Sequence, residues 1–167
     1  MNEEIFPIVN EQGETIGSAT RQECHSGSFL LHPVVHLHIF NENDEIYLQK
    51  RAMDKDVQPG KWDTAVGGHI DLGETVLEAL QREVYEELNI PDFEPVFVFR
   101  YIFQSTVEKE LINSFMTYYS DVISPNPAEI TEGRFWTLNE VRENLGKNVF
   151  TPNFELELQK LMKVLEK

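Results

Sequence analysis

Residues 67–90 read GGHIDLGETVLEALQREVYEELNI, and this stretch decides the fold. Two glycines precede a run in which apolar residues recur at helical spacing, so we expect a helix from about residue 73 to residue 88. One stripe of this helix should face the protein core. Its members are Leu77, Leu80, Val84 and Leu88.

Three carboxylates lie beside this stripe and not on the opposite, solvent-facing side. On a helical wheel Glu83 and Glu87 fall next to Leu80, and Glu86 falls next to Ala79. Acids three and four residues apart repel one another, and these stand at the end of the helix where the helix dipole disfavours negative charge. A bound Mg²⁺ or Mn²⁺ would offset that repulsion. The geometry alone leaves two interpretations open, a metal site and an acidic surface.

The residues around the carboxylates fit a ligand site. Gly67 and Gly68 would let the backbone pass close to a ligand, because glycine has no side chain. Arg82 could fold toward an acid and hold a carboxylate in place. An ordinary surface pair between Arg82 and Glu78, four residues apart, is the alternative.

The segment is similar to the sequence box of the Nudix hydrolases. That box reads Gly, five residues, Glu, seven residues, Arg-Glu, an aliphatic residue, any residue, Glu-Glu, any residue, Gly and an aliphatic residue. The matching positions are Gly68, Glu74, Arg82, Glu83, Val84, Glu86, Glu87, Asn89 and Ile90. Asn89 replaces the final Gly, and Asn is the usual second choice for the left-handed residue that ends a helix.

The resemblance implies an α/β (α+β) fold, the Nudix-type α/β/α sandwich around a mixed β-sheet. It also implies hydrolysis of a nucleotide or another small organic diphosphate, by attack of water on phosphorus with Mg²⁺ or Mn²⁺ as cofactor. The implied metal ligands are Glu83, Glu86, Glu87 and the carbonyl of Gly67. With these carboxylates Arg82 would complete the catalytic set by orienting a glutamate, while Gly68 and Glu74 would be structural. The box does not fix the general base.

A second resemblance links the chain to the type 1 isopentenyl-diphosphate isomerases and their hydrolase-like relatives. It rests on RQECHSGSFLLH at 21–32 and LQKRAMDKDVQPGKWDTAVGGH at 48–69. It implies a second divalent-metal site at His25, His32, His69, Glu108 and Glu110. The positions that bind diphosphate in the isomerases correspond to Arg21, Arg51 and Lys55. Trp136 corresponds to the tryptophan that faces the carbocation in those enzymes.

One departure decides against isomerase activity. The isomerases protonate an alkene with a cysteine just before Gly-His, and here that position is Gly67. The Nudix box is complete here, whereas the isomerases have a degraded one. We therefore favour a hydrolase, with the isomerase and a non-catalytic Nudix ligand sensor as alternatives. The alternative for Glu108 and Glu110 is a solvated turn.

The remaining sequence predicts one domain, residues 1–167, with a core at about 30–150, an N-terminal hairpin and a C-terminal helix. Expected strands are 5–9, 15–19, 34–40, 45–50, 62–66, 95–103, 112–121 and 134–136, and expected helices are 138–145 and 154–166. We interpret His36 and His38, which alternate on a strand, as structural. The four alternating aromatic residues should pack on one face; they are Phe97, Phe99, Tyr101 and Phe103.

The charge balance excludes some partners. The chain has 14 Lys and Arg against 29 Asp and Glu, a net charge of −15, which argues against a nucleic acid polymer or an anionic membrane as partner. The single Cys24 forms no internal disulfide, and no signal peptide or transmembrane span is visible, so we expect a cytoplasmic protein. The expected partner is a small-molecule diphosphate, and a homodimer is compatible with the sequence.

Overall fold

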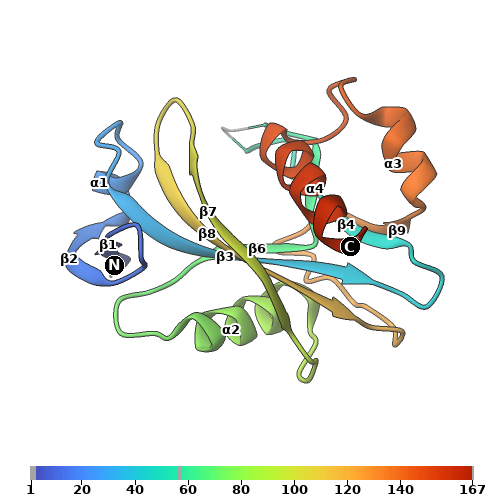
Figure 1. The fold of residues 1–167 in the computed structure, drawn as a ribbon, viewed down its shortest axis with the longest axis horizontal. Helices are drawn as coiled ribbons and strands as arrows, with labels where there is room; N and C mark the ends of the chain where they lie inside the picture. Colours follow the sequence, from blue (N-terminus) through green and yellow to red (C-terminus); the bar gives the residue numbers. More distant parts are fainter. Residues whose placement is uncertain (1–2, 56–57, 167) are drawn as a thin grey trace.

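The computed structural model describes residues 3–55 and 58–166 (Figure 1). The strands are β1 (Ile5–Val9), β2 (Thr15–Thr20), β3 (Leu31–Phe40), β4 (Ile46–Lys50), β5 (Trp62–Thr64), β6 (Val66–His69), β7 (Val96–Gln104), β8 (Lys109–Tyr118) and β9 (Glu132–Trp136). The helices are α1 (Arg21–Cys24), α2 (Val76–Leu88), α3 (Leu138–Asn144) and α4 (Pro152–Leu165). No helix within these described residues is long and apolar enough to cross a lipid bilayer.

A mixed seven-stranded sheet forms the centre of the fold. Its strands follow the order β5-β4-β3-β8-β7, while β6 pairs with β3 and β9 pairs with β4. The pairing of β3 with β8 is parallel and the other pairings are antiparallel. Strand β3 therefore lies beside both β6, which carries the double glycine, and β8, which follows Glu108.

Helices cover both faces of the sheet, which confirms the predicted α/β/α sandwich (Figure 1). On one face α2 packs Leu80, Val84 and Leu88 against alternate residues of β3 such as Leu37. On the other face α4 packs Phe154, Leu158 and Leu161 into a second cluster that includes the two tryptophans. Because successive side chains of a strand point to opposite faces, each strand of the sheet contributes to both clusters.

Helix α2 begins and ends where its capping residues allow. The Thr75 side chain accepts a hydrogen bond from the backbone N–H of Glu78, and the Glu78 side chain accepts one from the backbone N–H of Thr75, so the helix begins at Val76. Asn89 has φ 56° and ends the helix in the left-handed conformation, as the sequence predicts. The placement of Leu77 in the buried stripe is wrong. Leu77 is 51% exposed because the first turn extends beyond the cluster that Leu80 enters.

The double glycine lies inside a strand and does not follow one. The expected strand 62–66 is two strands, and β6 continues through Gly67 and Gly68 to His69. Backbone pairing with β3 sets this course, with His36 opposite Gly67 and Val34 opposite His69. Positions 67 and 69 of β6 therefore face one side of the sheet, and position 68 faces the other.

A β-bulge in β7 overturns the prediction that its aromatic residues share one face. The register with β8 shifts between Phe97 and Phe99, which pair with the consecutive residues Phe115 and Ser114. An extra residue reverses the direction of the side chains that follow it. Phe97 accordingly contacts Phe115, in the cluster beneath α2, whereas Phe99 packs into the cluster beneath α4.

Candidate active site and metal centres

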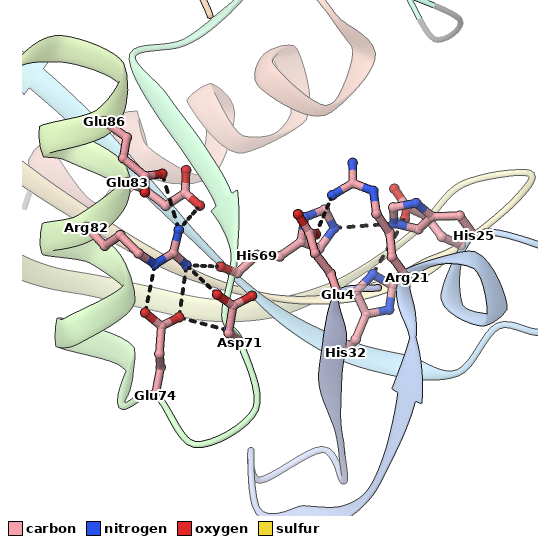
Figure 2. A network of polar contacts seen from close by, with 11 residues as sticks. Glu4, Arg21, His25, His32, His69, Asp71, Glu74, Arg82, Glu83 and Glu86 are labelled. Atoms are coloured by element: carbon pink, nitrogen blue, oxygen red, sulfur yellow. Dashed lines mark hydrogen bonds and ion pairs between the residues drawn. The ribbon is translucent and has the colours of Figure 1, made fainter. Parts of the chain in front are cut away.

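Arg82 organises the carboxylates of α2 (Figure 2). Its Nε and Nη2 donate to the two oxygens of Glu74, at 2.7 and 2.9 Å, and its Nη1 donates to Glu83 Oε1 at 2.7 Å. Nη2 also donates to the backbone carbonyl of His69 at 3.0 Å. The hydrogen bonds from Arg82 lower the pKa of Glu74, although burial opposes them. Arg82 therefore ties the loop before α2, the helix and β6 together.

The absence of a side chain at residue 68 makes room for Glu83. A β-carbon at Gly68 would overlap the carboxyl group of Glu83, so glycine lets this carboxyl group lie directly against β6. Arg82 holds Glu83 Oε1, which leaves Oε2 over the glycine as an available ligand atom.

The carboxylates are not neutralised by the protein alone. Burial raises the pKa of Glu83, although Arg82 opposes this shift. Burial, and then the charge of Glu83, raise the pKa of Glu87 well above its ordinary value. Glu87 Oε2 is buried and has no hydrogen-bond partner among the described residues, while Oε1 accepts a long bond of 3.4 Å from Gln49. Glu86 is half exposed and lies 3.4 Å from Arg82 Nη1.

This set of donors fits a divalent cation. Oxygen ligands that repel one another, one of them buried without a partner, are the environment that Mg²⁺ or Mn²⁺ stabilises. The backbone N–H of Gly67 faces the Glu87 carboxylate and lowers its pKa slightly, against the larger effect of burial, and the carbonyl of a strand residue points to the same side as its N–H. The Gly67 carbonyl is therefore directed toward the carboxylates.

Four of the five residues implied for the second metal site come together. The imidazoles of His25, His32 and His69 converge with the carboxylate of Glu108, and one ligand atom from each lies within 4.8 Å of all the others. We call these four residues the His/Glu cluster. Glu108 Oε2 is 2.7 Å from His25 Nε2 and 3.5 Å from His32 Nε2, and the Nε2 atoms of His25 and His69 are 3.3 Å apart.

Glu110 is not part of the group of converging ligands in the described residues. It lies in β8 opposite His32, whereas Glu108 precedes that strand in a turn closed by Ser105. The two carboxylates therefore do not share the strand geometry that would direct both to one ion. Burial, followed by the charge of Glu108, raises the pKa of Glu110 to about 7.

The His/Glu cluster also fits a metal ion by its chemistry. Burial lowers the pKa of His25, and burial with the nearby Arg21 lowers that of His69 well below its ordinary value. Neutral imidazoles are the form that ligates metals. Phe6 of the N-terminal hairpin stacks on His69, with ring centroids 4.5 Å apart and planes 5° apart, and so holds that ring in position. The two candidate sites lie on either side of His69 (Figure 2).

The expected substrate-binding residues lie in three different environments. Arg21 forms a 2.9 Å ion pair with Glu4 close to the His/Glu cluster (Figure 2). Arg51 Nη1 is 3.7 Å from Asp63, and Lys55 is exposed in the loop after β4. Trp136 is 5% exposed in the α4 cluster, and the guanidinium carbon of a neighbouring arginine lies 3.8 Å from the centre of its ring. Trp136 is thus a core residue here.

Sequence reasoning missed a buried polar network between β3 and α4. Glu157 is fully buried, and its Oε1 accepts from His36 Nδ1 at 2.8 Å and from Tyr101 Oη at 2.5 Å. Its Oε2 contacts His38 Nε2 and accepts from Ser114 Oγ at 2.8 Å. The signal was present, because Glu157 occupies a core position between Phe154 and Leu161 on an amphipathic helix, and two histidines alternate on an otherwise apolar strand.

The network is ionised. Burial by itself would lower the pKa of His36, but Glu157 outweighs burial and raises it to about 9. Burial opposes ionisation of Glu157, yet His36 and His38 lower its pKa well below the ordinary value. Burial and the charge of Glu157 raise the pKa of Tyr101, which keeps its hydroxyl as a donor. His36 and Glu157 therefore form an ion pair across the interface between the sheet and α4.

The comparisons with known proteins agree with this architecture. The model of the NUDIX domain family matches residues 30–154. A protein of Arabidopsis thaliana named Nudix hydrolase 3 is 38% identical over 137 residues, which are 77% of this chain and 18% of that protein. The isopentenyl-diphosphate Delta-isomerase 1 of Photorhabdus laumondii is 28% identical over 90% of both chains. A crystal structure from Deinococcus radiodurans shares the fold, with a TM-score of 0.79 and 23% identity over 94% of this chain and 98% of that one.

Proposed function

The chain belongs to the Nudix family, and from that premise we propose that it is a divalent-metal-dependent diphosphohydrolase acting on a nucleotide or another small organic diphosphate. Membership supports hydrolysis of a diphosphate. The observation that carries the proposal for this chain is the buried oxygen Oε2 of Glu87, which has no hydrogen-bond partner among the described residues and lies on a helix that Arg82 ties to β6.

Each residue of the proposed site has a role that follows from its contacts. Glu83 and Glu87 supply ligand oxygens that are already desolvated, and the half-exposed Glu86 adds one at the rim. Arg82 fixes the position of Glu83 before substrate binds, and Glu74 fixes Arg82. Metal ions bound there would neutralise the diphosphate, activate water and stabilise the leaving group. Preset ligands limit the reorganisation needed during reaction.

The direct test is a screen of nucleotides and prenyl diphosphates with Mg²⁺ or Mn²⁺. Both phosphate release and isomer formation are measured on the same samples. We expect metal-dependent release of phosphate or of a phosphorylated product from at least one diphosphate. Absence of hydrolysis across the screen, combined with tight binding of one compound, would favour the ligand-sensor alternative.

Isomerase activity is the second candidate, because several relatives carry that name. We predict that the purified protein does not interconvert isopentenyl and dimethylallyl diphosphate at enzymatic rates, since Gly67 offers no thiol to deliver a proton. Gly67→Cys alone should not create the activity, because a β-carbon there would lie 3.3 Å from the His36 ring and because the acid cluster is intact. Proton NMR of the two isomers measures this, and robust isomerisation by the wild type would overturn the hydrolase proposal.

We also propose that the His/Glu cluster binds a second divalent ion. Three imidazoles and one carboxylate suit Zn²⁺ or Mn²⁺. The N-terminal hairpin would then belong to the same domain as the sheet, because Phe6 stacks on His69 and His25 follows the hairpin directly. The alternative is a vestigial group of hydrogen-bonding residues that remained after an isomerase function was lost.

Zn²⁺ binding distinguishes these alternatives. Titration against a chromophoric chelator should show one tightly bound Zn²⁺ per wild-type chain. Glu108→Gln should lower the Zn²⁺ affinity at least about 100-fold, because substitution even of residues that only contact a ligand lowers metal affinity about 10- to 100-fold. Glu110→Gln is the matched control and should change the affinity less than about threefold, since Glu110 is outside the converging group. A wild type without tight Zn²⁺ makes the cluster vestigial, and equal losses in both variants contradict the assignment of ligands.

A further inference from the structure

His36 lies against Gly67, in the space that a side chain at residue 67 would need. The two residues lie directly opposite each other in the antiparallel pair of β3 and β6, so their side chains share one face. A β-carbon at residue 67 would lie 3.3 Å from Cδ2 and 3.5 Å from Nε2 of His36. The edge of the imidazole that carries Nε2 therefore borders the space where any other residue would place its side chain. Gly67 itself is exposed.

The other nitrogen of His36 is already engaged. Nδ1 is 2.8 Å from Glu157, a fully buried carboxylate that also accepts from Tyr101 and Ser114. These contacts fix both the ring plane and the direction of Nε2. The His36 side chain keeps 12% exposure, whereas His38 on the same carboxylate has none. Of the two imidazoles, only that of His36 can reach a molecule from solvent.

Gly67 adjoins the proposed metal site. Its N–H faces Glu87 and its carbonyl is directed to the same side, while the absence of a side chain at Gly68 makes room for the carboxyl group of Glu83. A diphosphate bound through metal at this carbonyl would pass within reach of the imidazole edge across the strand. A hydrogen-bond donor at this position would face an anionic oxygen of the diphosphate.

Resting on the proposed function, we propose that His36 contacts the substrate, its Nε2–H donating to an oxygen of the diphosphate while Glu157 acts as the positioning residue that holds the ring. The imidazole thus takes up the space that the side chain of residue 67 would otherwise fill. The site gains a donor on the α4 face of the sheet, opposite the carboxylates on the α2 face. The two sets of groups would hold the diphosphate from either side of β6.

Binding of methylenediphosphonate with Mg²⁺, measured by isothermal titration calorimetry, tests this assignment without turnover. His36→Gln should weaken binding about 10- to 100-fold, the scale of one charge-assisted hydrogen bond. His38→Gln is the matched control, because it removes the other imidazole from the same carboxylate, and it should change affinity less than about threefold. Mn²⁺ affinity measured by electron paramagnetic resonance should be unchanged in both variants. Equal affinity of His36→Gln and wild type, or equal losses in the two variants, overturns the proposal.

Gly67→Ala supplies a second test if His36→Gln does not fold. The added methyl would lie 3.3 Å from Cδ2 and cover the ring edge, while Glu157 keeps its contacts with Tyr101 and Ser114. We expect the same loss of methylenediphosphonate affinity in a variant that still unfolds cooperatively. Unchanged affinity in Gly67→Ala overturns the role of His36. So does a wild type that does not bind methylenediphosphonate at a concentration of about 1 mM. The substrate screen tests the hydrolase proposal independently, because the titration measures binding and requires no hydrolysis.

Discussion

Glu87→Gln should reduce kcat/KM for the hydrolysed diphosphate at least about 100-fold, the scale of losing one strong electrostatic contact in a preorganised site. The substitution keeps the shape of the side chain but removes the charge of a buried carboxylate whose Oε2 has no hydrogen-bond partner among the described residues. Glu86→Gln should reduce activity on the same scale, because Glu86 belongs to the same proposed ligand set. Steady-state kinetics with saturating Mg²⁺ measure both, and near-normal turnover by either variant would show that the metal site is assigned wrongly.

The stability of the metal-free protein tests the burial of Glu87. The folded-state pKa of Glu87 is raised, so its contribution to stability is full below the ordinary value of 4.5 and is lost as pH rises through the raised pKa. Metal-free Glu87→Gln should therefore equal the wild type near pH 4 and exceed it above neutral pH. Glu143→Gln, an exposed residue of α3, is the control for both activity and stability. Urea unfolding in chelator measures the difference, and a less stable Glu87→Gln at pH 8 would contradict the burial argument.

Glu157→Gln should destabilise the protein by about 3–5 kcal/mol, the loss expected when one partner of a buried ion pair is removed. The variant leaves the protonated His36 and the imidazole of His38 beside an amide that cannot compensate their charge. Urea unfolding at pH 6 provides the free energy. Glu155→Gln on the same helix is the matched control and should lose no more than about 1 kcal/mol, because its partly exposed side chain accepts one bond from Gly146.

The pH dependence identifies the ion pair as the source. The pKa of Glu157 is lowered, so its share of stability is present above 4.5 and is lost as pH falls. The pKa of His36 is raised to about 9, so its share is present below 6.5 and is lost as pH rises through 9. The difference between wild type and Glu157→Gln should be largest between about pH 4.5 and 6.5 and should shrink as pH rises from about 6.5 to 9. A difference that is constant from pH 6 to pH 10 would point to packing and not to charge.

Local patterns predict the helix and its chemistry well. The spacing of Leu80, Val84 and Leu88 sets the face of α2, and the box motif places Arg82 among the acids. These features depend on residues within one or two helical turns, where the geometry is regular. The same regularity placed Leu77 in the core, because a helical wheel does not show where the neighbouring sheet ends.

Contacts between distant segments were harder to predict. The bulge between Phe97 and Phe99 has no sequence signal of its own, and one extra residue reverses a face. Glu110 separates from Glu108 because the latter stands in a turn before β8 and not in the strand. The charge pair of His36 and Glu157 joins residues 121 positions apart, and nothing local to either indicates the other.

The family model covers residues 30–154, yet the His/Glu cluster and the proposed site at His36 both include residues outside this range. Phe6 and His25 precede the matched segment, and Glu157 follows it. A protein shortened to residues 30–154 would retain the box. It would lose Phe6 and His25 from the His/Glu cluster, and it would lose Glu157, which holds His36. The contribution of the two chain ends is therefore structural: they complete the His/Glu cluster and hold the ring of His36, on either side of the segment that the family model covers.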